Sequence, residues 1–492
     1  MTNTNAQTPR IAIVGSGFAG LGAAVSLKRQ GFDNIVIFEK ASDVGGVWRD
    51  NDYPGAACDV QSYLYSFSFA PNSQWGNTFA RQSEIYAYLR KVAVDFDLLP
   101  HIRFNTSVDA ARWDAGRSIW RLDTAGGVTE VEHLIVATGA LSEPAIPNLK
   151  GIEQFNGEVF HSARWNHSFD LEGKRVVVVG TGASAIQFVP AIQPKVDHLT
   201  LFQRTAPWVL PRHDRPIGSV ERTLMGTVPL LQQAERARIY VQREMAVLGF
   251  RNPLLMRIGE FQAKRHLRDQ VADPELRAKL TPDYRLGCKR ILISNEYLRS
   301  LDRPNADVVT SGIREVTADG VIDNDGVLHP ADAIILGTGF KTARLPLTDA
   351  IEVDGRTMGE TFGKSPRAYL GTSVAGYPNV YLMHGPNIGL GHTSVIQMFE
   401  SQVNYIVDAI SHAASQNAGA IEPTAEAQEQ FGQLVDRLTE GSVWTSGGCD
   451  SWYLDQTGRN SNLWPGTTFD FSARSKRFRA DDHVLTPAKV AS

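Results

Sequence analysis

The chain has 492 residues, of which 42% are apolar and 21% charged, and a formal net charge of −4. A chain of this length exceeds what one hydrophobic core supports, so we expect two or three domains. The near-neutral charge gives no reason to expect nucleic acid as a partner, and the composition is that of an ordinary soluble enzyme.

The N-terminal sequence MTNTNAQTPR is polar and lacks the apolar stretch of a signal peptide. No apolar run approaches the roughly 20 residues needed to span a bilayer. We therefore expect a cytoplasmic location without stable membrane insertion. The oligomeric state cannot be predicted.

The three cysteines, Cys58, Cys288 and Cys449, are odd in number, lie far apart and form no C-x-x-C pair. Zinc and redox sites usually show such pairs, so no metal site is predicted. We expect reduced thiols without a chemical role.

The first predicted unit spans residues 10–40, RIAIVGSGFAGLGAAVSLKRQGFDNIVIFEK. An apolar β run leads into Gly15, Gly17 and Gly20, a helix-compatible stretch follows, and a second β run ends at Glu39. A glycine loop alone is a weak signal, but its position between a strand and a helix favours a dinucleotide-binding βαβ unit.

The pattern repeats at residues 174–205, KRVVVVGTGASAIQFVPAIQPKVDHLTLFQRT, with Gly180, Gly182 and Ala185 in the corresponding places. Ser184 and Gln187 follow this second loop and are predicted to contact its cofactor. Two such units in one chain make coincidental glycine turns improbable. The fold class is therefore α/β, with two Rossmann-like dinucleotide-binding domains.

Two short β runs, EHLIVATGA (132–140) and ADAIILGTGF (331–340), end in Thr-Gly and suit strands that return the chain to the two sheets. After residue 341 the chain is expected to complete the first domain, with a helix over TSVIQMFESQVNYIVDAI. The predicted domains are 1–147 with 345–492, and 148–344.

Residues 215–285 are amphipathic and poor in strands, which predicts a helical subdomain inserted into the second domain. Charges of both signs are interleaved along it, so a lid packed on the nucleotide domain is favoured over a membrane-surface helix. Membrane pelleting that survived high salt would reverse this preference.

The residue after the second strand of each unit discriminates between dinucleotides. Glu39 can accept hydrogen bonds from a ribose diol, which suits FAD. Arg204, in Gln203-Arg204-Thr205, can pair with a 2′-phosphate and favours NADP, although it could also be a solvated surface charge. Hydride transfer from NADPH to FAD gives a reason for two such domains in one chain.

Two longer motifs are more specific than the glycine loops. FNGEVFHSARWN sets Phe155, Gly157, His161 and Trp165 in the order F-x-G-x-x-x-H-x-x-x-W, and GGVWRDNDYPGAACD runs from Gly45 to Asp59. With these motifs the chain strongly resembles the type I Baeyer-Villiger monooxygenases over nearly its whole length. The resemblance implies FAD, NADPH and O2, and conversion of ketones or aldehydes into esters or lactones through a C4a-peroxyflavin.

One position departs from the family pattern, because Asn166 stands where the first motif usually has Pro or Asp. This departure keeps oxygenation of nitrogen or sulfur by related flavin monooxygenases open as an alternative. A two-electron flavin reductase is a third possibility, although the C-x-x-C pair of thioredoxin reductase is missing.

The resemblance also implies roles for individual residues. Arg290 is expected to hold a permanent positive charge beside the flavin, with Asp59 positioning it, and Lys289 is expected to reach toward the NADP 2′-phosphate. A plain structural ion pair is the alternative for Asp59 and Arg290. The further predicted cofactor contacts are Gly46, Trp48, Tyr65, Val108, Thr205 and Trp452. His161 and Trp165 are expected to couple domain movement to cofactor position, not to act as acid or base.

Overall fold

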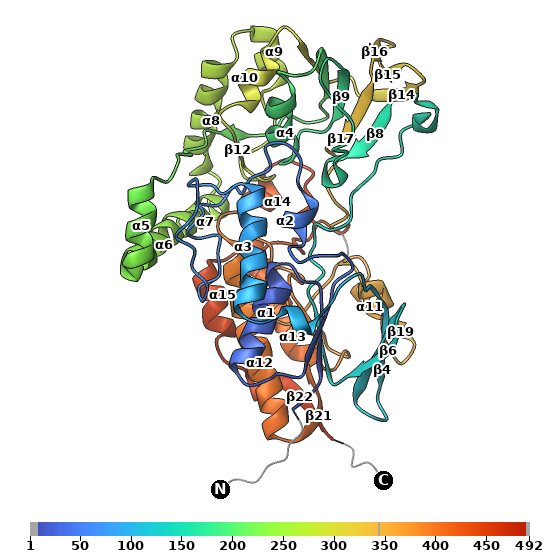
Figure 1. The fold of residues 1–492 in the computed structure, drawn as a ribbon, viewed down its shortest axis with the longest axis vertical. Helices are drawn as coiled ribbons and strands as arrows, with labels where there is room; N and C mark the ends of the chain where they lie inside the picture. Colours follow the sequence, from blue (N-terminus) through green and yellow to red (C-terminus); the bar gives the residue numbers. More distant parts are fainter. Residues whose placement is uncertain (1–7, 343–344, 489–492) are drawn as a thin grey trace.

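The computed structural model describes residues 8–342 and 345–488 and shows two parallel α/β domains, one above the other in Figure 1. The lower half combines the blue to teal N-terminal segment and the orange to red C-terminal segment, whereas the upper half consists mainly of green and yellow chain. This architecture confirms the predicted fold class.

The lower domain is built on a five-stranded parallel sheet with the order β20-β7-β1-β2-β3. Its strands are β1 (Ile11–Val14), β2 (Ile35–Phe38), β3 (Ile102–Arg103), β7 (His133–Val136) and β20 (Val380–Leu382). Strand β20 enters from beyond residue 341, so the C-terminal segment does complete the first domain. The helix expected there is α12 (Val395–Ser415), which packs against α1 (Phe18–Arg29).

A second sheet covers the other face of this parallel sheet. Its order is β19-β18-β4-β5-β6, and one buried cluster joins Trp120 and Ile351 of this sheet to Val14 of the first. Its strands are β4 (Val108–Asp114), β5 (Ile119–Thr124), β6 (Gly127–Val131), β18 (Ile351–Val353) and β19 (Arg356–Thr357). The remaining elements of this half are α2 (Val47–Asp50), α3 (Gln82–Asp95), α11 (Met358–Phe362), α13 (Ala425–Thr439), α14 (Val443–Ser446), α15 (Thr468–Ser475), β21 (Ala418–Pro423) and β22 (His483–Pro487).

The upper domain repeats the parallel sheet with the order β13-β10-β9-β17-β8. Its strands are β8 (Glu158–His161), β9 (Arg175–Val179), β10 (His198–Phe202), β13 (Ala306–Val309) and β17 (Ala333–Leu336). The helices of this domain are α4 (Ala185–Ile192) and α10 (Tyr297–Leu301). A small antiparallel sheet consists of β14 (Ile313–Thr317), β15 (Gly320–Asp323) and β16 (Leu328–Pro330). Strands β7 and β17 are the two expected returning strands. Each lies beside the first strand of its βαβ unit.

The first glycine of each loop is required by the same close approach. Gly15 (φ +107°) and Gly180 (φ +108°) have left-handed backbone, and a Cβ on either would lie 2.5 Å from a carbonyl oxygen, that of Ala137 or of Gly337. No L side chain fits such a contact. Both loops therefore turn tightly over the strand that returns from the inserted segment.

The chain crosses between the domains twice, and the two crossings lie side by side. Ala145 N–H donates to Gly339 O at 2.8 Å, and Lys341 N–H donates to Glu143 O at 2.9 Å. This paired linker supports the expected boundaries at 147/148 and 344/345, which stay a proposal. Residue 344 lies outside the described ranges.

Residues 215–285 are helical, as expected. They contain α5 (Ser219–Thr227), α6 (Pro229–Glu244), α7 (Ala246–Arg251), α8 (Met256–Gln270) and α9 (Pro274–Lys279), between the short strands β11 (Val209–Leu210) and β12 (Leu292–Ile293). Helices α5 and α6 stand out from the body at the left of Figure 1. Within the described ranges, no helix combines the length and hydropathy needed to cross a membrane.

Candidate active site

The second motif forms a loop that joins the glycine turn of the lower domain to the upper domain. At its start, a Cβ on Gly46 (φ +54°) would lie only 3.1 Å from the Cα of Gly17. Trp48 then donates from Nε1 to the hydroxyl of Tyr65 at 3.1 Å, and the two rings pack edge to face. The structure thus gathers Gly17, Gly46, Trp48 and Tyr65, all predicted cofactor contacts, at one end of α1.

The middle of this loop is fastened to α4 of the upper domain. Tyr53 donates to Oε1 of Gln187 at 3.0 Å, and Gln187 Nε2 donates to the carbonyl oxygen of Ala57 at 2.9 Å. Gly55 (φ +82°) allows this contact, since a Cβ there would lie 2.5 Å from the carbonyl oxygen of Gln187. Gln187 was predicted as a cofactor contact, and in this structure its amide holds the two domains together.

The loop ends at Asp59, where it meets Arg290. The guanidinium donates from Nε to Asp59 Oδ2 at 3.0 Å and from Nη2 to the same oxygen. Burial would raise the pKa of Asp59, but the charges of Arg290 and Arg243 outweigh it, and that pKa is lowered. The charge of Asp59 raises the pKa of Arg290 despite desolvation. Both side chains are therefore ionised at neutral pH.

Two further guanidinium groups reach this loop, and sequence reasoning missed both. Arg243 of α6 donates to the carbonyl oxygen of Asp59 at 2.9 Å and to Gln61 Oε1 at 2.7 Å. Arg212, just after β11, donates to the carbonyl oxygen of Cys58 at 3.3 Å. Burial lowers the pKa of both arginines. The site is thus a carboxylate surrounded by three cations from the upper domain and its insertion.

Apolar and aromatic side chains pack beside this charged cluster. Phe250, Trp444 and Tyr453 belong to one buried group that also contains Cys288, and the charge on Arg290 interacts with Tyr453. Trp452, predicted as a cofactor contact, is 43% exposed and packs against Tyr453 with ring centroids 4.7 Å apart. Its role in covering a cofactor stays a prediction.

The expectation of three reduced thiols is wrong for two of them. Cys288 and Cys449 form a disulfide with a Cα–Cα distance of 6.1 Å, although 161 residues separate them in sequence. A Cβ on Gly447 would lie 2.7 Å from the Cβ of Cys288, so the glycine lets the two loops approach. Sequence spacing could not reveal this pair. Cys58 is free, as expected, and it is buried.

Thiol titration checks this disulfide. Protein unfolded in guanidinium chloride without reductant should react with one equivalent of Ellman's reagent, from Cys58, because the other two sulfurs are bonded to each other. After reduction and removal of the reductant, three equivalents should react. Three equivalents from freshly purified, unreduced protein would contradict the disulfide.

The first motif divides between the two ends of the upper sheet. Gly157, before β8, allows a close approach of the chain. A Cβ there would lie 2.3 Å from the carbonyl oxygen of Asp332 and 2.7 Å from the ring of Phe155. His161, at the other end of β8, accepts from the N–H of Ala163 through Nδ1, and burial lowers its pKa. Trp165 packs edge to face on Phe160 at 5.1 Å.

His161 also faces the interdomain linker, since its ring lies 5.9 Å from that of Phe340. The expected coupling role for His161 and Trp165 stays a prediction. Asn166 accepts through Oδ1 from Ser168 N–H at 3.1 Å and from Ser168 Oγ at 2.6 Å. An aspartate oxygen could accept the same two bonds, so the departure from the family pattern preserves this turn.

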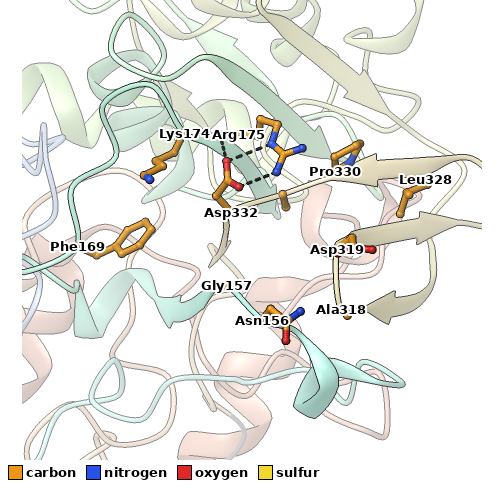
Figure 2. A pocket seen from close by; sticks show the side chains of 11 residues that line it. Asn156, Gly157, Phe169, Lys174, Arg175, Ala318, Asp319, Leu328, Pro330 and Asp332 are labelled. Carbon is orange, nitrogen blue, oxygen red and sulfur yellow. Dashed lines mark hydrogen bonds and ion pairs between the residues drawn. The ribbon is translucent and has the colours of Figure 1, made fainter.

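A surface cavity of about 540 Å³ lies away from both glycine loops. Figure 2 shows that Arg175 and Asp332 meet there in an ion pair, with Gly157 nearby. These residues mark the amino ends of β9, β17 and β8, whereas dinucleotides bind at the carboxyl ends of parallel strands. The cavity is therefore not the cofactor site.

The first glycine loop fits FAD in its backbone. Gly17 caps α1 without a side chain, leaving N–H groups at the helix N-terminus for a pyrophosphate. The side-chain oxygens of Thr393 and Ser394, at the start of α12, are buried without a protein partner and could bind a polar ligand.

Val108 begins β4 and packs against the buried cluster of that half, so a cofactor contact for it stays a prediction.

The Glu39 carboxylate already makes several hydrogen bonds and an ion pair within the protein, which the sequence does not reveal. Its carboxylate accepts from Ser16 N–H at 3.0 Å, Ser16 Oγ at 2.7 Å and Ala41 N–H at 2.9 Å, and it pairs with Arg49 at 3.2 Å. A ribose diol would have to share or displace one of these donors. The buried carboxylate has the expected position at the end of β2, and its contact with the ribose stays a prediction.

The second loop fits NADP, and the charges beside it favour a phosphate. A Cβ built on Gly182 would have no described atom within 4 Å, so the space over the start of α4, beside Ser184, is open. Arg204 is exposed and makes no hydrogen bond or ion pair with any residue in the described ranges. Burial and the nearby charge of Arg204 lower the pKa of Lys289. Thr205 accepts from Thr181 Oγ1 at 2.9 Å, which fixes this strand end to the glycine loop.

Comparison with known proteins places this arrangement in a family. Residues 8–226 match the family model described as flavin-binding monooxygenase-like. The chain is 47% identical to a Baeyer-Villiger monooxygenase of Streptomyces coelicolor over 97% of its own length and 93% of that protein. It is 46% identical to a Baeyer-Villiger monooxygenase of Pseudomonas aeruginosa, over 100% and 94% of the two chains.

Among solved structures, a cyclohexanone monooxygenase from Rhodococcus sp. Phi1 bound to NADP+ superposes with a TM-score of 0.86. It is 29% identical, and the match covers 98% of this chain and 99% of that one. Together with the two glycine loops, these findings establish FAD and NADPH as the cofactors and a flavin monooxygenase as the enzyme type. The chain belongs to the type I Baeyer-Villiger monooxygenases.

Proposed function

We propose that this enzyme uses O2 and NADPH to convert apolar ketones, and aldehydes as a second carbonyl class, into esters or lactones in the cytoplasm. The observation that carries the proposal is the Asp59–Arg290 pair, held where the two dinucleotide domains meet and beside a buried apolar and aromatic cluster. FAD, which the first glycine loop with Gly15, Gly17 and Gly20 would hold, would supply the redox chemistry, namely hydride acceptance from NADPH and activation of O2.

Arg290 supplies a positive charge that deprotonation does not remove. Its guanidinium is ionised at every working pH, and the neighbouring carboxylate raises its pKa further. A fixed charge of this kind favours negative charge that develops beside it, and it does so more strongly where water is excluded. The Arg290 side chain is 38% exposed, so its free edge is available to a ligand.

Asp59 positions this guanidinium. Both donors that Arg290 gives to Asp59 go to one oxygen, which fixes the plane of the guanidinium and leaves its other N–H groups free to point elsewhere. Arg243 fixes the backbone of Asp59 from the insertion. We infer that Asp59 and Arg243 are positioning residues and that Arg290 is the catalytic residue.

The buried aromatic cluster beside Arg290 favours apolar carbonyl compounds. Phe250 and Trp444 stack with ring centroids 5.4 Å apart, and Tyr453 of the same cluster has its pKa raised to about 12 by burial. Tyr453 is therefore neutral at working pH. Such a surface excludes water and offers few partners to a charged substrate.

A carbonyl panel tests the proposal. Purified holoenzyme is given NADPH and isotopically labelled O2 with linear, cyclic and aryl ketones, one aldehyde and one sulfide. We expect esters or lactones that carry one labelled oxygen, in amounts that match the NADPH consumed. Oxidation of the sulfide alone would favour heteroatom oxygenation, and hydrogen peroxide with every compound would contradict both functions.

A further inference from the structure

The helical insertion exposes an unusual concentration of apolar side chains. Within the described ranges, 12 of the 22 exposed large hydrophobic residues lie between positions 220 and 261. We call these 12 the outer face of the insertion: Val220, Leu224, Val228, Leu230, Leu231, Val241, Met245, Leu248, Leu254, Leu255, Ile258 and Phe261. Isolated exposed apolar residues are ordinary, but contiguous groups mark an interaction surface.

On α6 and α7 the exposed residues follow the helical period. Leu230, Ala234, Ala237, Val241, Met245 and Leu248 recur every three or four residues, and all six are exposed. The opposite side of α6 is engaged with the protein, because Ile239 is buried and Arg243 reaches the Asp59 loop. The exposed stripe is therefore separate from the candidate active site.

Helix α8 carries a second such stripe. Met256, Ala263 and Leu267 are buried, whereas Ile258 and Phe261 on the same helix are 65% and 62% exposed, and Leu254, just before the helix, is 65% exposed. A helix that is apolar on two sides normally buries both. The second side of α8 has no partner in the described part of the chain.

The charges around this outer face are strongly biased. Residues 220–270 contain nine Lys and Arg against five Asp and Glu, within a chain of net charge −4. The exposed charged side chains of this segment are Arg238, Arg251, Arg257, Lys264, Arg265 and Arg268, against Asp269 alone. Arg251, Arg257 and Arg268 make no ion pair with a described residue.

Two of the five acids of this segment, Glu244 and Glu260, face the protein. Glu260 is buried and pairs with Arg285, and Glu244 accepts from Thr468 at 3.0 Å. The interleaving of both signs in the sequence, which favoured a lid, is therefore only partly preserved at the surface, where six exposed cations face one exposed acid. Arg236 and Arg243 also point inward, and Glu221, Glu235 and Asp269 pair with arginines at the surface, so the excess of exposed cations comes mainly from Arg251, Arg257, Lys264 and Arg268.

We propose that the outer face rests on an anionic lipid bilayer, with its apolar side chains at the boundary between headgroups and acyl chains and its arginines on the lipid phosphates. Aliphatic residues, Met and Phe flanked by cations are the composition of helices that lie in a membrane surface. Helices α5 and α6, which carry five of these residues on their exposed sides, protrude from the body at the left of Figure 1. A symmetric contact between two copies would instead bring six exposed cations against six.

Vesicle binding tests the proposal. FAD-loaded enzyme is sedimented with sucrose-filled vesicles of phosphatidylcholine alone or with one quarter phosphatidylglycerol. We expect binding to the anionic vesicles, with partition at least about 10-fold above that to neutral ones, since several cations each contribute near the surface. Raising the salt to about 1 M should weaken the binding without abolishing it, because the apolar contacts are unscreened.

Paired variants separate the apolar and charge contributions. Leu254→Gln/Ile258→Gln should abolish binding to either vesicle, whereas Val327→Gln/Leu328→Gln, an exposed apolar pair on the other side of the upper domain, should leave it unchanged. Arg251→Gln/Arg257→Gln should reduce partition roughly 10- to 30-fold, about 1 kcal/mol per cation. All three pairs are exposed, so retention of FAD absorbance verifies folding.

Two results would overturn the proposal. One is a failure of the wild-type enzyme to bind anionic vesicles. The other is a concentration-dependent dimer in analytical ultracentrifugation that Leu254→Gln/Ile258→Gln dissociates, which would make the outer face an interface between two copies of the chain.

Discussion

Replacing Arg290 with Ala is expected to lower ester formation roughly 100- to 1000-fold, the usual cost of removing one preorganised stabilising group. FAD should stay bound, because Arg290 lies on the opposite domain from the first glycine loop. NADPH should still be oxidised, with the electrons appearing as hydrogen peroxide. Product analysis and peroxide measurement in the same reaction therefore give the result, and an unchanged ester yield would remove Arg290 from the mechanism.

Matched variants show whether the effect is specific. Arg290→Lys keeps the charge but cannot give two donors to one oxygen of Asp59, so we expect intermediate activity. Arg10→Ala breaks another Arg–carboxylate pair, with Glu132 at 2.7 Å, at the base of the lower sheet. It should retain full activity. Loss of activity in Arg10→Ala would show that the assay reports damage to folding.

The positioning role of Asp59 has its own signature. Asp59→Asn keeps the shape and removes the charge that raises the pKa of Arg290. We expect ester yield per NADPH to fall while NADPH oxidation persists, as for Arg290→Ala but less severely. A purely structural role would lower FAD content and both rates together.

The two parallel sheets and their glycine loops could be predicted from the sequence because each is specified by residues close together in the chain. A buried parallel strand appears as an unbroken apolar run, and the glycines after it are demanded by backbone contacts within the same unit, as for Gly15 and Gly180. The two sheets have corresponding strand orders, so recognising one unit helped to recognise the other. The returning strands and the C-terminal addition to the first sheet followed from the same rules.

The charged centre of the site could not be derived from spacing. Asp59 and Arg290 are 231 residues apart, and only resemblance to a family paired them. Arg243 sits in an amphipathic helix where an arginine is expected to face solvent, and only the docking of α6 on the loop turns it inward. Cys288 and Cys449 were missed for the same reason. Contacts between distant segments depend on how the insertion and the C-terminal loops pack.

The cofactor preference is expected to depend on Arg204 and Lys289 together. The positive charges of Arg204 and Lys289 repel each other, and Arg204 has no acidic partner among the described residues. An anion bound between them would relieve this repulsion, and the 2′-phosphate of NADPH is such an anion. Arg204→Ala/Lys289→Ala should raise KM for NADPH roughly 100-fold, since a charge-assisted contact contributes about 1.5 kcal/mol or more for each residue. KM for NADH, which lacks the phosphate, should change little.

The expected kinetics distinguish binding from catalysis. Because these contacts are made equally in the bound and reacting states, kcat at saturating NADPH should be preserved. Arg29→Ala, an exposed arginine of α1 stacked on Phe69 and remote from the second loop, serves as the control and should leave both constants unchanged. A double variant that still prefers NADPH as strongly as the parent enzyme would show that the 2′-phosphate is recognised elsewhere, and the two cations would then be ordinary surface charges.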